Sequence, residues 1–227
     1  MKQLILDISP PQSPSLANFI AGHNVELLQM LYTLAASGLQ ERFVYVWGET
    51  GSGKSHLLKA FLQSMSVNQR DVIYINAGMH QVIDPEALEN AVVTVDDVEL
   101  LDEQQQIALF NLYNRMREGQ GVLLVSGHCA PAQLTLRQDL VTRLGWGLIY
   151  QIHALSDVEK IQALKTHSQE RGFELSQEVA EYLLRHWRRD MPSLLAMLDS
   201  LDRFSLETKR PITIPLLKQL LQPANAA

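Results

Sequence analysis

The sequence predicts an α/β domain, in which a five-stranded parallel sheet lies between helices, followed by a small all-helical domain. Over the first two thirds of the 227 residues, short apolar runs alternate with helical patterns. That alternation is typical of strand–helix–strand units whose strands are buried on both faces. The first apolar run leads into a glycine-rich phosphate-loop motif, GETGSGKS (48–55), and beyond residue 152 helical patterns prevail.

The expected strands are rich in Val, Ile, Leu and Tyr. They are RFVYVWG (42–48), DVIYINA (71–77), AVVTVDD (91–97), GVLLVSG (121–127) and GLIYQI (147–152). Helices are expected where apolar residues recur every three or four positions. In the first domain these segments are 24–37, 54–65 and 102–117.

The helical domain has recognisable start and stop signals. Ser156 and Glu159 predict a capping box, and Gly172 predicts the end of that first helix. The last stretch, ITIPLLKQLL (212–221), predicts a short strand or turn and then a helix. Three segments are therefore expected, a peptide with its linker, the α/β domain and the helical domain, over residues 1–15, 16–153 and 154–227.

Composition excludes several classes of protein. The net charge is −6, with 9 Lys and Arg against 15 Asp and Glu up to residue 153, and 10 against 10 beyond it. Neither half is basic, so the electrostatic footprint of a nucleic-acid-binding domain is absent. The longest apolar runs have about seven residues, too few for a membrane helix. Cys129 is the only cysteine, which excludes an intrachain disulfide or a cysteine-based metal site.

The motif at residues 48–55 matches G-x-x-x-x-G-K-[ST], in which backbone N–H groups surround phosphate oxygens. Lys54 is expected to reach the β- and γ-phosphates, and Ser55 to hold Mg²⁺. The helix that begins at Lys54 directs its positive end at the same anion. A glycine-rich hairpin turn is the alternative, but it does not explain the strand before the motif and the helix after it. The expected cofactor-binding residues here are Gly48, Glu49, Thr50, Gly51, Ser52, Gly53, Lys54, Ser55 and His56.

Two adjacent carboxylates, Asp96 and Asp97, end the third strand. Carboxylates at that end of a parallel strand face the phosphate loop. We expect Asp96 to hold Mg²⁺ through water and Asp97 to orient the attacking water. Alternatively, the two aspartates could cap the helix that begins near residue 102.

With these motifs the sequence resembles the AAA+ ATPases of the DnaA family over essentially the whole chain, and most closely the branch of regulatory inactivators of DnaA. The matching segments are NFIAGHN (18–24), GETGSGKSHLL (48–58), VTVDDVELL (93–101), DLVTRLGWG (139–147) and RGFELSQEV (171–179). The resemblance implies an AAA+ P-loop domain with a helical lid, and ADP or ATP with Mg²⁺ as cofactors. It also implies that Ile20 and Ala21 contact adenine and that Ser126 contacts phosphate or water.

Arg143, in DLVTRLGWG, matches the arginine finger that members of the family insert into the ATP site of a partner subunit. A guanidinium supplies a fixed charge and a bidentate fork to the phosphoryl group in transfer. The alternative is a surface helix arginine in an ion pair. With the resemblance, we interpret Arg143 as the finger.

The sequence departs from the family pattern at two sensor positions. His128 follows the fourth strand where relatives often have aspartate or asparagine, and Pro192 occupies the position of an arginine in the lid. Proline suits the first turn of a helix but cannot contact phosphate, and Arg188 and Arg189 are its nearest substitutes. Nucleotide binding is therefore expected, with weak hydrolysis by the chain itself.

The opening stretch KQLILDI (2–8) precedes the proline-rich linker SPPQSP. It is too short for a signal peptide, and an edge strand fits poorly before three prolines. It resembles the family's clamp-binding peptide, although Asp7 departs from the usual apolar residue or proline. Leucines buried in an apolar groove contribute ~1.5–3 kcal/mol each. The expected clamp-binding residues are Gln3, Leu4, Leu6 and Ile8.

The resemblance implies a negative regulator of replication initiation. Such a protein docks on the DNA-loaded sliding clamp, the polymerase beta subunit, and stimulates hydrolysis of ATP bound to the initiator DnaA. It implies a cytoplasmic protein associated with the nucleoid through the clamp, and head-to-tail association of copies. Direct sequence-specific DNA binding is not expected, because no helix-turn-helix domain follows the lid, and no membrane partner is expected. A DnaA-like helicase loader and a P-loop kinase acting on a small molecule stay open as alternatives.

Overall fold

The computed structural model describes residues 13–37, 41–66, 70–79 and 81–221. They form two compact units that divide between Ala154 and Leu155. The opening peptide, with its expected clamp-binding residues, lies outside the described residues.

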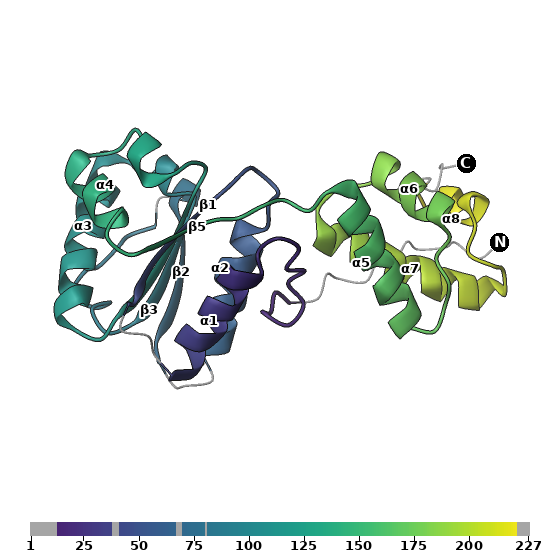
Figure 1. The fold of residues 1–227 in the computed structure, drawn as a ribbon, viewed down its shortest axis with the longest axis horizontal. Helices are drawn as coiled ribbons and strands as arrows, with labels where there is room; N and C mark the ends of the chain where they lie inside the picture. Colours follow the sequence, from purple (N-terminus) through teal and green to yellow (C-terminus); the bar gives the residue numbers. More distant parts are fainter. Residues whose placement is uncertain (1–12, 38–40, 67–69, 80, 222–227) are drawn as a thin grey trace. The chain divides into compact units, whose positions relative to one another are not determined.

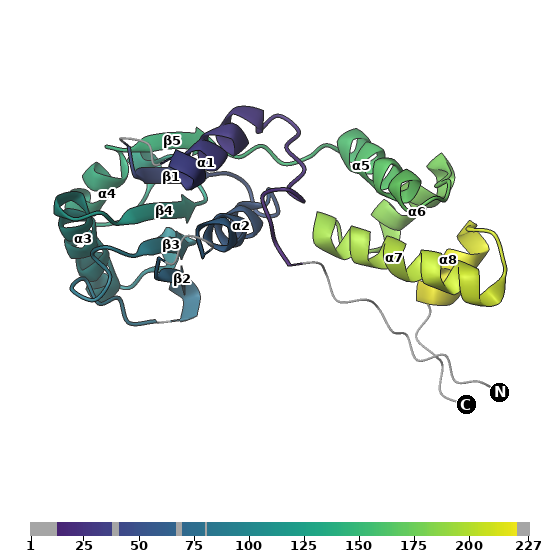
Figure 2. The same cartoon turned by 90° about the horizontal axis from the view of Figure 1, so that it is seen from below.

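The first unit contains a five-stranded parallel sheet, as the sequence predicts (Figure 2). Its strands are β1 (Phe43–Trp47), β2 (Val72–Asn76), β3 (Val92–Asp96), β4 (Val122–Gly127) and β5 (Leu148–Gln151). Their order across the sheet is β2-β3-β4-β1-β5. The neighbouring strands β3 and β4, which lie between β2 and β1 in this order, are buried along their whole length.

Helices cover both faces of the sheet (Figure 1). One face carries α1 (Val25–Ser37) and α2 (Lys54–Ser66), and the other carries α3 (Glu103–Glu118) and α4 (Gln138–Leu144). Short 3₁₀ turns lie between them, namely η1 (Ala77–Met79), η2 (Val98–Leu100) and η3 (Pro131–Gln133).

Alternation along the strands divides the apolar side chains between the two faces. In β1, Phe43 and Tyr45 pack in the cluster that includes the apolar side of α3. Val44 and Val46 pack in the cluster that includes α1 and α2. The strands β1, β2, β3 and β4 contribute to both cores, whereas the edge strand β5 contributes only to the core that includes α1 and α2. Burial on both faces explains why the interior strands are continuously apolar in sequence.

Asp102 caps α3 with a complete capping box to Gln105. This finding excludes the alternative that Asp96 and Asp97 cap that helix. The pair of aspartates is thus available for another role at the end of β3.

The second unit is a helical bundle of α5 (Asp157–Glu170), α6 (Gln177–His186), α7 (Met191–Thr208) and α8 (Ile214–Leu221). The predicted capping box of Ser156 and Glu159 is present at the start of α5. Gly172 follows the end of that helix with a φ of 84°, a left-handed conformation that glycine adopts readily. The predicted last helix is confirmed as α8, whereas residues 210–213 before it are irregular and form neither a strand nor a turn. Among the described residues, no helix has the length and apolarity needed to cross a membrane.

Candidate functional site

The phosphate-loop motif forms the connection between β1 and α2. Gly51 and Gly53 have φ values of 80° and 101°, in the left-handed region that other residues adopt at a cost. At Gly48 a Cβ atom would lie 2.3 Å from the carbonyl oxygen of Ile152. Backbone conformation therefore favours glycine at Gly51 and Gly53, and close packing against the end of β5 requires glycine at Gly48.

Lys54 is the first residue of α2, and its side chain is buried at 7% exposure. Its ammonium donates to the carbonyl oxygens of Gly48, at 2.8 Å, and Glu49, at 3.1 Å. A buried ammonium at a helix N-terminus provides positive charge where phosphate oxygens bind.

Other groups of the loop also fit a phosphate ligand. The Ser52 hydroxyl is buried and has no hydrogen-bond partner among the described residues, which is uncommon for a polar atom removed from water. Ser55, Glu49 and Thr50 are exposed. Among the described residues no group of three His, Cys, Asp or Glu side chains could enclose a metal ion. Mg²⁺ would therefore depend on Ser55, Asp96 and the phosphates, as is common for this ion.

The segment before α1 lies beside the loop. A Cβ atom on Gly53 would lie 3.1 Å from Cε2 of Phe19, and His56 Nε2 lies 3.0 Å from the Asn18 side-chain oxygen. Burial, ahead of the charge of Lys59, lowers the pKa of His56. Ile20 and Ala21 follow Phe19 and are half-buried. The segment that the sequence assigned to adenine thus starts in contact with the phosphate loop.

Asp96 is 1% exposed, and both of its carboxylate oxygens accept hydroxyl hydrogen bonds. Ser126 donates to Oδ1 at 2.5 Å, and Tyr74 donates to Oδ2 at 2.6 Å. The three residues project from β3, β4 and β2. The predicted contact residue Ser126 is itself fully buried, so within this chain it orients Asp96.

Asp97 follows in a left-handed conformation, with φ 55° and ψ 57°, and its N–H donates to the Ser126 hydroxyl at 3.0 Å. Burial raises the pKa of Asp97, and the charges of Asp96 and Glu99 add to this effect. Lys54 and His128 act in the opposite direction. The charges of Lys54 and His128 therefore act on Asp97 at the end of β3, close to the phosphate loop.

We expect Asp97→Asn to stabilise the α/β domain in the absence of nucleotide. Asparagine tolerates the left-handed conformation, and the change removes repulsion from Asp96 and Glu99. The expected gain is about 1 kcal/mol, or roughly 2–4 °C in Tm. Because the pKa is raised, the folded state holds the proton more tightly, so the cost of the charge is present at neutral pH and is lost on acidification. Thermal unfolding between pH 7 and about pH 4 should show the gain shrinking, and a lower Tm at pH 7 would contradict it.

The turn after β4 is anchored from two sides. Tyr45 donates its hydroxyl to the Cys129 carbonyl oxygen at 2.8 Å. Gly127 leaves the space for this, since a Cβ atom there would lie 2.0 Å from the Tyr45 oxygen. His128 Nδ1 lies 3.0 Å from Glu99 Oε1. The first sensor position thus holds an exposed histidine paired with a carboxylate of η2.

Arg143 lies near the end of α4, over the aromatic rings of Trp146 and Phe110, at 4.0 and 5.4 Å from their centroids. Its Nε donates to the Asn114 side-chain oxygen at 3.0 Å. Within the described part of the chain, no hydrogen bond involves the two terminal nitrogens of its guanidinium. The guanidinium of Arg143 is therefore held at Nε, and its two terminal nitrogens can still donate hydrogen bonds.

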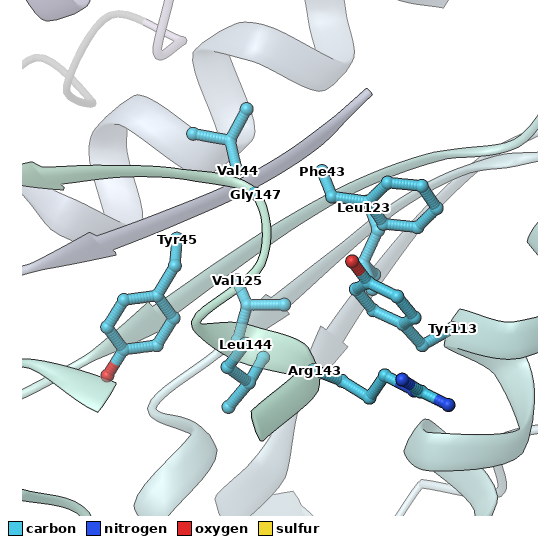
Figure 3. A pocket seen from close by; sticks show the side chains of 9 residues that line it. All are labelled: Phe43, Val44, Tyr45, Tyr113, Leu123, Val125, Arg143, Leu144 and Gly147. Atoms are coloured by element: carbon cyan, nitrogen blue, oxygen red, sulfur yellow. The ribbon is translucent and has the colours of Figure 1, made fainter. Parts of the chain in front are cut away.

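Arg143 also lies at the edge of the sheet opposite to the phosphate loop. Together with Phe43, at the start of β1, it lines a cavity of about 10 Å³ (Figure 3), whereas Gly48 follows the end of β1. Gly147 keeps the connection close, because a Cβ atom there would lie 2.1 Å from the Phe43 carbonyl oxygen. The cavity has room for about one water molecule, so it is no ligand site. Arg143 cannot reach the loop of its own chain across the sheet.

The second sensor position lies in the helical unit. Pro192 occupies the first turn of α7 after the N-cap residue Asp190, as its sequence context predicts. Arg189 forms an ion pair with Asp157 at the start of α5, and Arg188 is exposed.

Family comparisons agree with this geometry. The profile of the bacterial DnaA ATPase domain matches residues 12–151, more than half of the chain. The chain belongs to the DnaA family of AAA+ ATPases. The profile of the Hda lid domain matches residues 157–221 of this DnaA-family chain. A relative from Haemophilus influenzae, an uncharacterised protein, is 39% identical over 97% of this chain and 98% of its own length.

Solved structures share the fold of this DnaA-family chain. Domain III of the Thermotoga maritima replication initiation protein DnaA aligns with a TM-score of 0.72 and 19% identity, over 93% of this chain and 98% of that one. DnaA from Aquifex aeolicus bound to AMPPCP aligns with a TM-score of 0.69 and 21% identity, over 88% and 71%. RuvB from Thermotoga maritima, in its A156S form, aligns with a TM-score of 0.65 and 17% identity, over 92% and 71%. These likenesses show the fold, and the two family profiles identify it as an AAA+ P-loop domain with a helical lid.

Sequence reasoning missed the partners of the predicted site residues. Tyr74, Asn114 and Glu99 were not singled out, although each contacts a residue that was. Tyr74 lies two residues before Asn76, which pairs with Asp96, but this register between β2 and β3 cannot be read from the sequence. For Glu99 the obstacle is the left-handed Asp97, which turns the chain.

Proposed function

We propose that this chain is a nucleotide-bound regulator that docks on the DNA-loaded sliding clamp and stimulates hydrolysis of the ATP held by DnaA. Arg143 would complete the DnaA active site in trans, and the product would be ADP-bound DnaA, which cannot restart replication. The Hda-type lid and the DnaA-type ATPase domain support a role in the regulation of replication.

The position of Arg143 carries the proposal. It lies at the opposite edge of the sheet from its own phosphate loop, with two terminal guanidinium nitrogens available for a phosphate oxygen. An arginine in that place acts only on a nucleotide held by another subunit. The same geometry supports head-to-tail association of copies, in which one chain presents Arg143 to the loop of the next.

The phosphate loop supports binding of ADP or ATP by the chain itself. Buried Lys54, the unpartnered Ser52 hydroxyl and the start of α2 provide charge and donors for phosphate oxygens. Mg²⁺ would be held by Ser55 and, through water, by Asp96, and would neutralise phosphate charge. Strong hydrolysis by the chain is not part of the proposal, because the two sensor positions hold His128 and Pro192.

The clamp-docking step is tested with the opening peptide of the full chain. We expect the double variant Leu4→Ala with Leu6→Ala to lose clamp binding by at least about 100-fold, because two leucines leave an apolar groove. Calorimetry or surface plasmon resonance with purified clamp measures this. The matched control is Leu206→Ala, which removes a leucine that is 72% exposed in the lid and should bind as the parent does.

Equal binding of the clamp by the parent and the double variant would refute the docking peptide. A second arm replaces the clamp by the replicative helicase. Tight binding to the helicase, with none to the clamp, would instead favour a helicase loader.

A further inference from the structure

Both carboxylate oxygens of Asp96 accept a hydrogen bond from a hydroxyl group. One such bond would be enough to orient a carboxylate for a metal ion. Strand alternation brings Asp96 and Ser126 to the sheet face that α2 covers, together with Val92 and Leu124 of the same strands. Tyr74 reaches the same carboxylate from the edge strand β2. Two hydroxyl donors therefore occupy its two oxygens, and hydrogen bonds from hydroxyl groups to carboxylates are strong.

Ser126 alone suffices to orient the Asp96 side chain. Its hydroxyl donates to Oδ1 and at the same time accepts the N–H of Asp97. This fixes the serine between β3 and β4, two neighbouring interior strands, and fixes Asp96 with it. The bond from Tyr74 is thus additional, and its main consequence is that Oδ2 loses accepting capacity.

The Tyr74 hydroxyl is the donor to this oxygen. The two oxygens lie 2.6 Å apart, and a carboxylate oxygen can only accept a hydrogen bond. The Tyr74 ring packs against the core between the sheet and α1 and α2, which leaves the side chain little freedom to withdraw.

We propose that Tyr74 is a positioning residue that restrains the magnesium site, because its hydroxyl occupies the Asp96 oxygen that a hydrated Mg²⁺ would otherwise use. This inference rests on the proposed nucleotide binding. Mg²⁺ keeps most of its waters in such sites, and those waters need carboxylate oxygens as acceptors. In the parent chain Asp96 offers these waters only its remaining lone pairs, and nucleotide binding depends less on Mg²⁺ as a result.

The test is Tyr74→Phe, which removes one oxygen atom and keeps the ring in the core. ADP affinity is measured by calorimetry in EDTA and over a range of Mg²⁺ concentrations. We expect the Mg²⁺ concentration of half-maximal effect to fall by about tenfold, the equivalent of one hydrogen bond to a charged group. Affinity in EDTA should stay within about twofold, whereas a merely structural role would change it.

The matched control is Tyr150→Phe, the same change on the other edge strand. Tyr150 lies on β5 and packs against the same core as Tyr74, so its Mg²⁺ dependence should equal that of the parent. An unchanged or higher half-maximal concentration in Tyr74→Phe overturns the inference, as does the absence of any Mg²⁺ effect in both proteins. Binding of ADP by the parent separates that failure from failure of the proposed function, because a parent that binds no ADP overturns both.

Discussion

Lys54→Ala is expected to weaken binding of ADP and ATP by at least about 100-fold. Removal of one partner from a buried, hydrogen-bonded charge pair costs 2–5 kcal/mol or more, and Lys54 is the only buried lysine or arginine in the described part of the chain. Its ammonium now binds two carbonyl oxygens of the loop. Those bonds place it where phosphate oxygens would replace them. Calorimetry with ADP and with a non-hydrolysable ATP analogue measures the loss.

The control for this experiment is Lys59→Ala. Lys59 lies in the second turn of the same helix, α2, but its side chain is exposed. The variant should bind both nucleotides within about twofold of the parent, a difference of less than 0.5 kcal/mol. If Lys54→Ala and Lys59→Ala bind equally well, the loop is not the nucleotide site.

Arg143→Ala is expected to lower the stimulated rate of ATP hydrolysis on DnaA by about 10³-fold or more, the size of the effect of an arginine finger. Arg143→Lys should fail as well, because an ammonium lacks the planar fork that contacts two oxygens at once. Single-turnover hydrolysis of radiolabelled ATP bound to DnaA measures both variants. Binding of ADP by each variant should equal that of the parent, since Arg143 lies at the other edge of the sheet.

Arg117→Ala provides the matched control. Arg117 comes from α3 and also lies over the Trp146 ring, at 5.5 Å from its centroid, so it shares the surroundings of Arg143 but not the hydrogen bond to Asn114. Its variant should keep most of the stimulation. Full stimulation by Arg143→Ala, or an equal loss in Arg117→Ala, would refute the assignment of the finger.

The sequence predicted the elements well where one physical signal dominated. Strands buried on both faces must be apolar throughout, and all five apolar runs are strands, although β2 and β5 at the two edges are only partly buried. The two ends of α5 were equally predictable. Ser156 caps the start of the helix, and Gly172 takes up a left-handed conformation just after its end. The motif glycines likewise indicated a loop whose backbone approaches other groups closely.

Side-chain partners across the sheet were less predictable. The contact of Tyr74 with Asp96 depends on the register between β2 and β3, which apolar runs of similar length do not specify. The pairing of Glu99 with His128 depends on the single left-handed residue Asp97. Arg143 was assigned through the family resemblance, and its remoteness from its own loop has a simple topological reason. It precedes β5 whereas the loop follows β1, and parallel strands all start at the same edge of the sheet.

The central claim is that this chain supplies an arginine to ATP held by DnaA at the clamp. The most direct measurement starts from DnaA loaded with radiolabelled ATP and follows conversion to ADP after addition of the parent chain with clamp-loaded DNA. We predict rapid conversion with all three components, and slow conversion when the clamp is omitted or when Arg143→Ala replaces the parent. Conversion at the unstimulated rate of DnaA in the presence of the parent chain and loaded clamp would contradict the account.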